Sequence, residues 1–151
     1  AGASTQRDRE TGFRMGLKDF KKSLFSHALG NFSTETAKTV TREMFAGTQK
    51  PDAIFVATDH MAFAVIDVLR SELNLGIPND VSIVGYDDSP PASWAAYNLT
   101  TLRQRSNLMV DQTVKLMIEK IQDPKAVSRH IKIPSPLIVR GSSRIPERWN
   151  T

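Results

Sequence analysis

The chain has 151 residues, of which 40% are hydrophobic and none is cysteine. That length allows one ordinary hydrophobic core, and the lack of cysteine excludes a disulfide scaffold as well as thiol-based catalysis or metal binding. The net charge of +4 comes from basic residues scattered along the chain, which indicates solvated helix faces and not a nucleic-acid interface.

The first part of the chain alternates helix and strand signals. Apolar residues spaced three and four positions apart in residues 7–22 predict a helix, and Ser33 supplies an N-cap for a second helix over residues 34–47. Residues 23–29 predict a short strand of weak propensity. The continuous apolar run 53–57 predicts a strand that is covered on both faces of its sheet.

The clearest helix of the chain begins after Asp59, which is a residue suited to an N-cap. Gly76 and Pro78 end this helix, and a buried strand follows over residues 81–85. One apolar stripe runs along the helix and consists of Ala62, Val65, Ile66, Leu69 and Leu73.

The last part of the chain continues the alternation. Residues 100–104 predict an extended segment, residues 106–122 predict a helix, and residues 130–133 and 137–139 predict two final strands. The apolar stripe of the helix consists of Val110, Val114, Met117 and Ile121. Strands that alternate with helices through right-handed crossovers predict an α/β fold, in which helices cover both faces of a parallel sheet.

The most informative segment is the apolar run Val81–Val84, which Gly85 stops. An aromatic ring and two carboxylates, those of Asp87 and Asp88, follow at once. In open α/β sheets, ligands bind outside the carboxyl ends of the strands. We therefore expect these carboxylates to lie at a ligand-binding edge.

This run resembles the sugar-sensing domain of the lactose-repressor/galactose-repressor family of bacterial transcription regulators. The likeness extends from about residue 7 to about residue 144, in the family's order and roughly its spacing, so it is specific. The other segments that carry the resemblance are Arg9–Phe13, Pro51–Ala62, Leu99–Gln104 and Leu137–Ser143.

The resemblance implies a type I periplasmic-binding-protein-like fold, of which this chain is one lobe. Residues 1–151 would be the C-terminal half of a two-lobed effector-binding domain, with the ligand between the lobes. The helix near residues 105–124 would belong with the first lobe, so its apolar stripe is expected to pack on that lobe or on a partner chain.

The resemblance also implies a set of ligand-binding residues: Arg9, Phe32, Thr58, Asp59, Asp87 and Gln104. Arginine and carboxylate groups suit the hydroxyl groups of a sugar, and an aromatic ring suits its apolar face. The family commonly has asparagine where Thr58 stands, which leaves the identity of the ligand open.

Each of these residues has an ordinary structural alternative. Arg9 would pair with a helix neighbour such as Glu10, and Phe32 would be a hydrophobic staple for the helix that follows it. Asp87 would cap a turn, while Asp59 is expected to act chiefly as a helix cap. Asp88 is expected to cap a helix that begins near residue 90.

By the resemblance, the chain is the effector-sensing part of a homodimeric cytoplasmic repressor, which meets DNA only through an N-terminal headpiece outside this sequence. We expect no enzyme activity, cofactor, metal or membrane contact. Two alternatives remain, namely a periplasmic sugar-binding protein of a transport system and a small α/β enzyme that uses Asp87 and Asp88 as acid and base.

Overall fold

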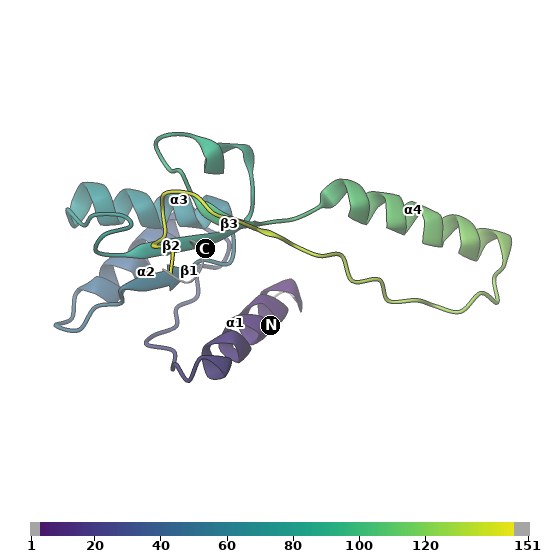
Figure 1. Cartoon of the computed structure of the whole chain (residues 1–151), viewed down its shortest axis with the longest axis horizontal. Coiled ribbons are helices and arrows are strands. Elements are labelled where there is room, and N and C mark those ends of the chain that lie inside the picture. Colours follow the sequence, from purple (N-terminus) through teal and green to yellow (C-terminus); the bar gives the residue numbers. More distant parts are fainter. Residues whose placement is uncertain (1–3, 147–151) are drawn as a thin grey trace.

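The computed structural model describes residues 4–146, and its centre is a four-stranded sheet with helices against it (Figure 1). The helical elements are α1 (Ser4–Asp19), α2 (Thr34–Phe45), α3 (Asp59–Asp67), the π turn η1 (Val68–Glu72), the 3-10 turn η2 (Pro90–Ser93) and α4 (Ser106–Gln122). The strands are β1 (Ala53–Phe55), β2 (Ser82–Asp87), β3 (Thr100–Arg103) and β4 (Leu137–Ile138).

The sheet has the order β1-β2-β3-β4. The first three strands are parallel, with Ile54 opposite Ile83 and Val84 opposite Thr100, as the alternation of elements predicts. The last strand, β4, is antiparallel to β3, so the sheet is mostly and not wholly parallel. The carboxyl ends of the three parallel strands therefore meet at one edge.

Two predicted strands are absent. Residues 23–29 and 130–133 have no regular secondary structure. A strand forms only when a neighbouring strand pairs with its backbone, and β1 pairs with β2 alone. The local sequence contains no information about that missing neighbour.

The hydrophobic core lies between the sheet and the pair α2 and α3. Ser33 caps α2 as predicted, because its Oγ accepts a hydrogen bond from the Thr36 backbone N–H at 3.2 Å. The predicted apolar stripe is buried from Ala62 in α3 to Leu69 in η1, and its last residue, Leu73, is half-buried just after η1. The most buried members of the core cluster are Ala62, Ile66 and Leu69 from this stripe, Ile83 from β2, and Leu99 just before β3.

The other face of the sheet faces α1, which stands off from it. The rings of Phe13 and Phe55 stack with centroids 5.0 Å apart and connect α1 to β1. Between the helix and the sheet lies a hollow of about 960 Å³, which Val84, Tyr86 and Leu102 also line. This face thus has a helix over it, but it is not tightly packed.

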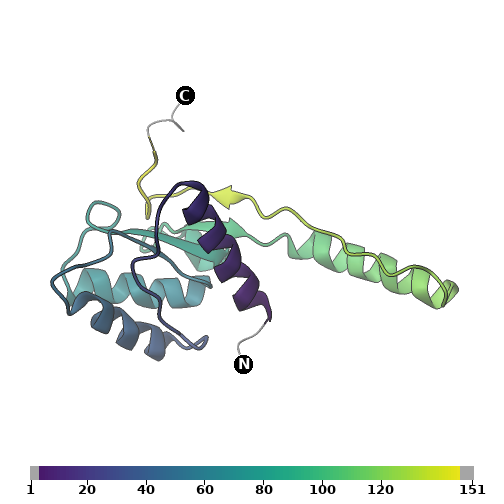
Figure 2. The same cartoon turned by 90° about the horizontal axis from the view of Figure 1, so that it is seen from below.

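The helix α4 projects away from the rest of the molecule. Figures 1 and 2 show it joined to the sheet by two chain segments, and we call residues 105–135 the arm. No residue of α4 is buried, and the structure describes the whole helix. The residues of its predicted stripe are between 48% and 75% exposed: Val110, Val114, Met117 and Ile121.

Candidate functional site

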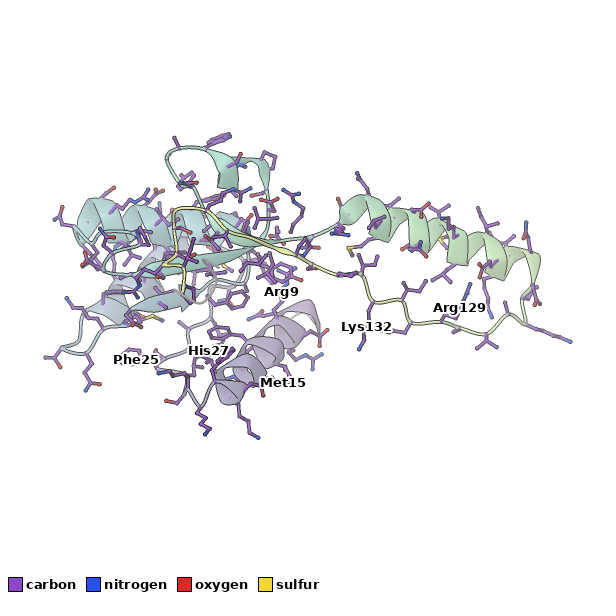
Figure 3. All side chains as sticks on the ribbon, in the orientation of Figure 1. Arg9, Met15, Phe25, His27, Arg129 and Lys132 are labelled. Carbon is purple, nitrogen blue, oxygen red and sulfur yellow. The ribbon has the colours of Figure 1, made fainter. Side chains whose placement is uncertain are left out.

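The candidate site lies at the carboxyl ends of β1, β2 and β3. Asp87 ends β2, Gln104 follows β3 directly, and Ala57 and Thr58 follow β1. Because these strands are parallel, their ends bring residues together that are up to 47 positions apart in the sequence. The helix α1 adds Arg9 to the same place, between α1 and the sheet (Figure 3).

Asp87 is at the centre of this arrangement. Its Oδ1 lies 3.6 Å from Nη2 of Arg9 and accepts a hydrogen bond from Nε2 of Gln104. The backbone of Asp59, at the start of α3, also hydrogen-bonds to the carboxylate. Burial nevertheless raises the pKa of Asp87 above its usual range, although the bonds to Gln104 and Arg9 oppose that rise.

Arg9 is held by three groups at once. Its Nη1 donates to the Ala57 carbonyl, and its guanidinium lies 3.8 Å from the centroid of the Tyr86 ring. Its ion pair with Asp87 is the third contact. The alternative that Arg9 pairs with Glu10 is wrong, because Glu10 pairs with Arg14 at 2.8 Å.

The expectation that Asp59 is a helix cap is also wrong. The N-cap of α3 is Thr58, and Asp59 is 1% exposed. Its Oδ2 accepts from the backbone N–H and the hydroxyl of Ser89 at 2.7 and 3.1 Å, and its Oδ1 accepts from Thr101 Oγ1 at 2.6 Å. A buried carboxylate needs such donors, and they come from distant positions in the chain.

The sequence predicted that Asp88 caps the helical turn near residue 90, and this prediction is wrong. Asp88 accepts from Arg103 Nε at 2.5 Å and from Arg140 Nη2 at 2.7 Å, while Ser89 is the N-cap of η2. Burial raises the pKa of Asp88, but the two arginines lower it more, so the pKa is below its usual range. Asp87 and Asp88 thus have different surroundings and opposite pKa shifts.

Thr58 has a buried hydroxyl without a partner. The residue is 5% exposed, and its Oγ1 makes no hydrogen bond to any of the described residues. An unsatisfied buried hydroxyl is costly, so a group that bonds to it would gain affinity.

Phe32 lies near the site but in a different hollow. The residue is 45% exposed, and its carbonyl contacts Nε2 of His60 at 3.1 Å. It lines a hollow of about 530 Å³ beside β1, whereas Arg9, Tyr86 and Gln104 line the hollow of about 960 Å³ under α1. The structure therefore brings Arg9, Asp87 and Gln104 into contact but does not place Phe32 in contact with them.

Sequence reasoning missed three residues of this region, which are Tyr86, Arg103 and Arg140. Tyr86 could have been recognised from the sequence as a site residue, because this aromatic residue directly precedes the two carboxylates. The two arginines had no local signal, because Arg140 meets Asp88 across 52 positions of sequence.

The described residues offer no site for a metal and no membrane span. Within residues 4–146, no group of three or more histidine or acidic side chains is placed to hold a metal ion. Over the same range, no helix has both the length and the apolar composition that crossing a bilayer requires.

Residues 1–143 match the family described as the periplasmic binding protein-like domain. The lactose operon repressor of Rhizobium radiobacter is 30% identical over 112 residues, which cover 74% of this chain and 97% of that sequence. Other curated relatives are longer, and the chain spans about 40% of their length.

Two solved structures resemble this chain over nearly its whole length. The lac repressor bound to ONPG in its repressed state has a TM-score of 0.84 and 26% identity, covering 92% of this chain and 42% of that one. The complex of the transcriptional regulator CelR with cellobiose has a TM-score of 0.77 and 27% identity, covering 90% and 42%.

Proposed function

The chain belongs to the periplasmic binding protein-like domain family, among the lactose-repressor-like transcription regulators, and we propose that it senses a small neutral ligand for a bacterial repressor. The ligand would be a sugar or a sugar derivative, bound against the carboxyl edge of the sheet. Binding would change the arrangement of the two lobes in a homodimer, and with it the affinity for an operator.

The contact of Arg9, Asp87 and Gln104 is the observation that carries this proposal. The guanidinium donates up to five hydrogen bonds, the carboxylate accepts several, and the amide does both. The positive and negative charges of Arg9 and Asp87 offset each other, so the site suits a ligand without net charge. A neutral molecule with many hydroxyl groups matches that chemistry, and cellobiose in the CelR complex is such a molecule.

Two further residues support a polyhydroxy ligand. The Thr58 hydroxyl is buried without a partner at the start of α3, where a ligand hydroxyl would satisfy it. Phe32 is 45% exposed in the neighbouring hollow beside β1, and we assign its ring to contact with the apolar face of the sugar. Asp59 is already bonded to Ser89 and Thr101, so we assign it to holding the loop and not to direct ligand contact.

The rest of the proposed regulator lies outside this sequence. A DNA-reading headpiece and the first lobe would precede it, and the protein would work in the cytoplasm. The family description is also compatible with a sugar-binding transport protein of the periplasm. The sequence upstream would discriminate between the two, as a helix-turn-helix or as a signal peptide. The names of the curated relatives, which are repressors, favour the regulator.

An enzyme that uses Asp87 and Asp88 as paired acid and base has less support. Such a pair requires two carboxyl groups that face one reacting bond. Here Asp88 is held between two arginines, and its low pKa keeps it ionised, so it does not suit the role of an acid.

Calorimetric titration of the intact regulator with a panel of neutral mono- and disaccharides tests the proposal. Once a sugar binds, we expect Arg9→Ala and Asp87→Ala to weaken it by roughly 10- to 100-fold, the effect of losing a charged hydrogen bond. Arg7→Ala is the matched control, because Arg7 lies on the exposed side of the same helix. Unchanged affinity in both site variants would contradict the proposal.

A further inference from the structure

The direction of the arm relative to the sheet has to be set at its base. No residue of α4 is buried, so the helix has no packed face that would hold it in place. The chain leaves the sheet after Arg103 and returns near Pro136, and only these two segments join the arm to the body (Figure 1). The backbone N–H of Arg103 donates to the Pro136 carbonyl at 2.9 Å, which connects the two segments.

Asp88 binds both segments at the same time. Arg103 is the last residue before the arm leaves the sheet, and Arg140 follows β4 just after the chain returns. Both guanidinium groups donate to this one carboxylate, at 2.5 and 2.7 Å, and its side chain is 7% exposed. Arg140 is fixed further by its bond to the Leu99 carbonyl at 2.8 Å.

The turn that carries Asp88 is strained and is held from several sides. Asp87 and Asp88 have φ angles of 133° and 58°, which residues with a side chain rarely adopt. Ser89 binds Asp59 behind the turn, and the Gln104 backbone N–H donates to the Asp87 carbonyl at 3.2 Å in front of it. A turn held in this way fixes the position of the Asp88 carboxylate, to which Arg103 and Arg140 at the base of the arm bind.

From this geometry we propose that Asp88, Arg103 and Arg140 form a positioning clamp that fixes the direction of the arm relative to the sheet. The carboxylate offsets two positive charges that lie side by side, one on each segment. Without it, the two arginines repel each other and the base of the arm opens. The clamp is independent of what ligand Asp87 binds, so this inference stands apart from the proposed function.

Distance measurement between two spin labels tests the clamp. The chain contains no cysteine, so labels can be placed through Ser71→Cys on the body and Gln122→Cys at the far end of α4, both at exposed positions. Asp88→Asn is expected to shift the distance distribution and at least about double its width, because further arm directions become populated. Arg103→Ala, which changes a half-exposed side chain, is expected to broaden it less.

The control is Asp111→Asn, whose carboxylate pairs with Lys115 inside the arm and does not touch its base. It should leave the distribution unchanged. Thermal unfolding of each variant separates loss of the fold from loss of the clamp, and Arg103→Ala decides the question if Asp88→Asn does not fold. Distributions in Asp88→Asn and Arg103→Ala that superpose on that of the parent would overturn the inference.

Discussion

At the scale of single residues, the neighbours Asp87 and Asp88 have different tasks although they are chemically identical. Burial dominates at Asp87 and raises its pKa, whereas two arginines outweigh burial at Asp88 and lower its pKa. The difference arises because the chain turns sharply after β2, with φ angles of 133° at Asp87 and 58° at Asp88, so the two side chains meet different neighbours. Asp87 thus meets Arg9 of α1 and Gln104, and Asp88 meets Arg103 and Arg140 at the base of the arm.

These opposite shifts predict opposite dependences of stability on pH. Folding raises the pKa of Asp87, so the folded state favours the protonated carboxyl group over the ionised one. The protonated group therefore contributes to stability below pH about 4, and this contribution is lost as the pH rises through the folded pKa. Asp87→Asn should therefore be slightly more stable than the parent at pH 7. Thermal unfolding at pH 7 and at pH about 3.5 would show this difference shrink in acid.

Asp88→Asn is the matched comparison and should behave in the reverse way. Folding lowers the pKa of Asp88, so its contribution to stability is present at neutral pH and is lost as the pH falls below about 4. We expect this variant to be less stable than the parent at pH 7, by about 1–3 kcal/mol for its charged hydrogen bonds. Shifts of the same sign in both variants at pH 7 would contradict the assignment.

At the scale of elements, helices were predicted from the sequence better than isolated strands. The helix over residues 106–122 has the predicted bounds, and Ser33 caps α2 as expected. Both depend on local signals, which are periodicity and a capping side chain. Residues 23–29 and 130–133 have no neighbouring strand to pair with, and the local sequence does not show whether such a neighbour is present.

The candidate site was predictable to a similar degree. The position of Asp87 after a buried strand, together with the family resemblance, pointed to Arg9 and Gln104, which the structure brings to it. The role of Asp59 was not predictable, because the same residue type serves as a cap or as a buried acceptor. Only the positions of Ser89 and Thr101 decide between these roles.

The exposed stripe of α4 gives a prediction for this element. Val114→Lys combined with Met117→Lys should change the free energy of unfolding by less than about 0.5 kcal/mol, since neither side chain is buried. We also predict that the chain associates with itself through this stripe, because an exposed apolar stripe promotes association, and that the double variant abolishes this association. Sedimentation velocity at increasing concentration measures both. A large loss of stability would show instead that the stripe packs within the chain.

At the scale of the whole molecule, the chain supplies only one side of the proposed ligand site. Under the proposed function, Arg9, Asp87 and Gln104 would contact the ligand from the sheet edge, and this chain matches only about 40% of the length of the longer relatives. Ligand sites commonly bury roughly 70–90% of the surface of the ligand. One edge of one lobe covers far less of a sugar than that.

We therefore predict that the 151-residue chain binds the sugar at least about 100-fold more weakly than the intact regulator, a loss of about 2.7 kcal/mol. Titration of both proteins with the same sugar measures the ratio, and circular dichroism of the shorter chain confirms that it is folded. Arg9→Ala should weaken binding in both proteins, because each of them contains the edge to which Arg9 belongs. Equal affinities in the two proteins would mean that the edge formed by Arg9, Asp87 and Gln104 suffices without a second lobe.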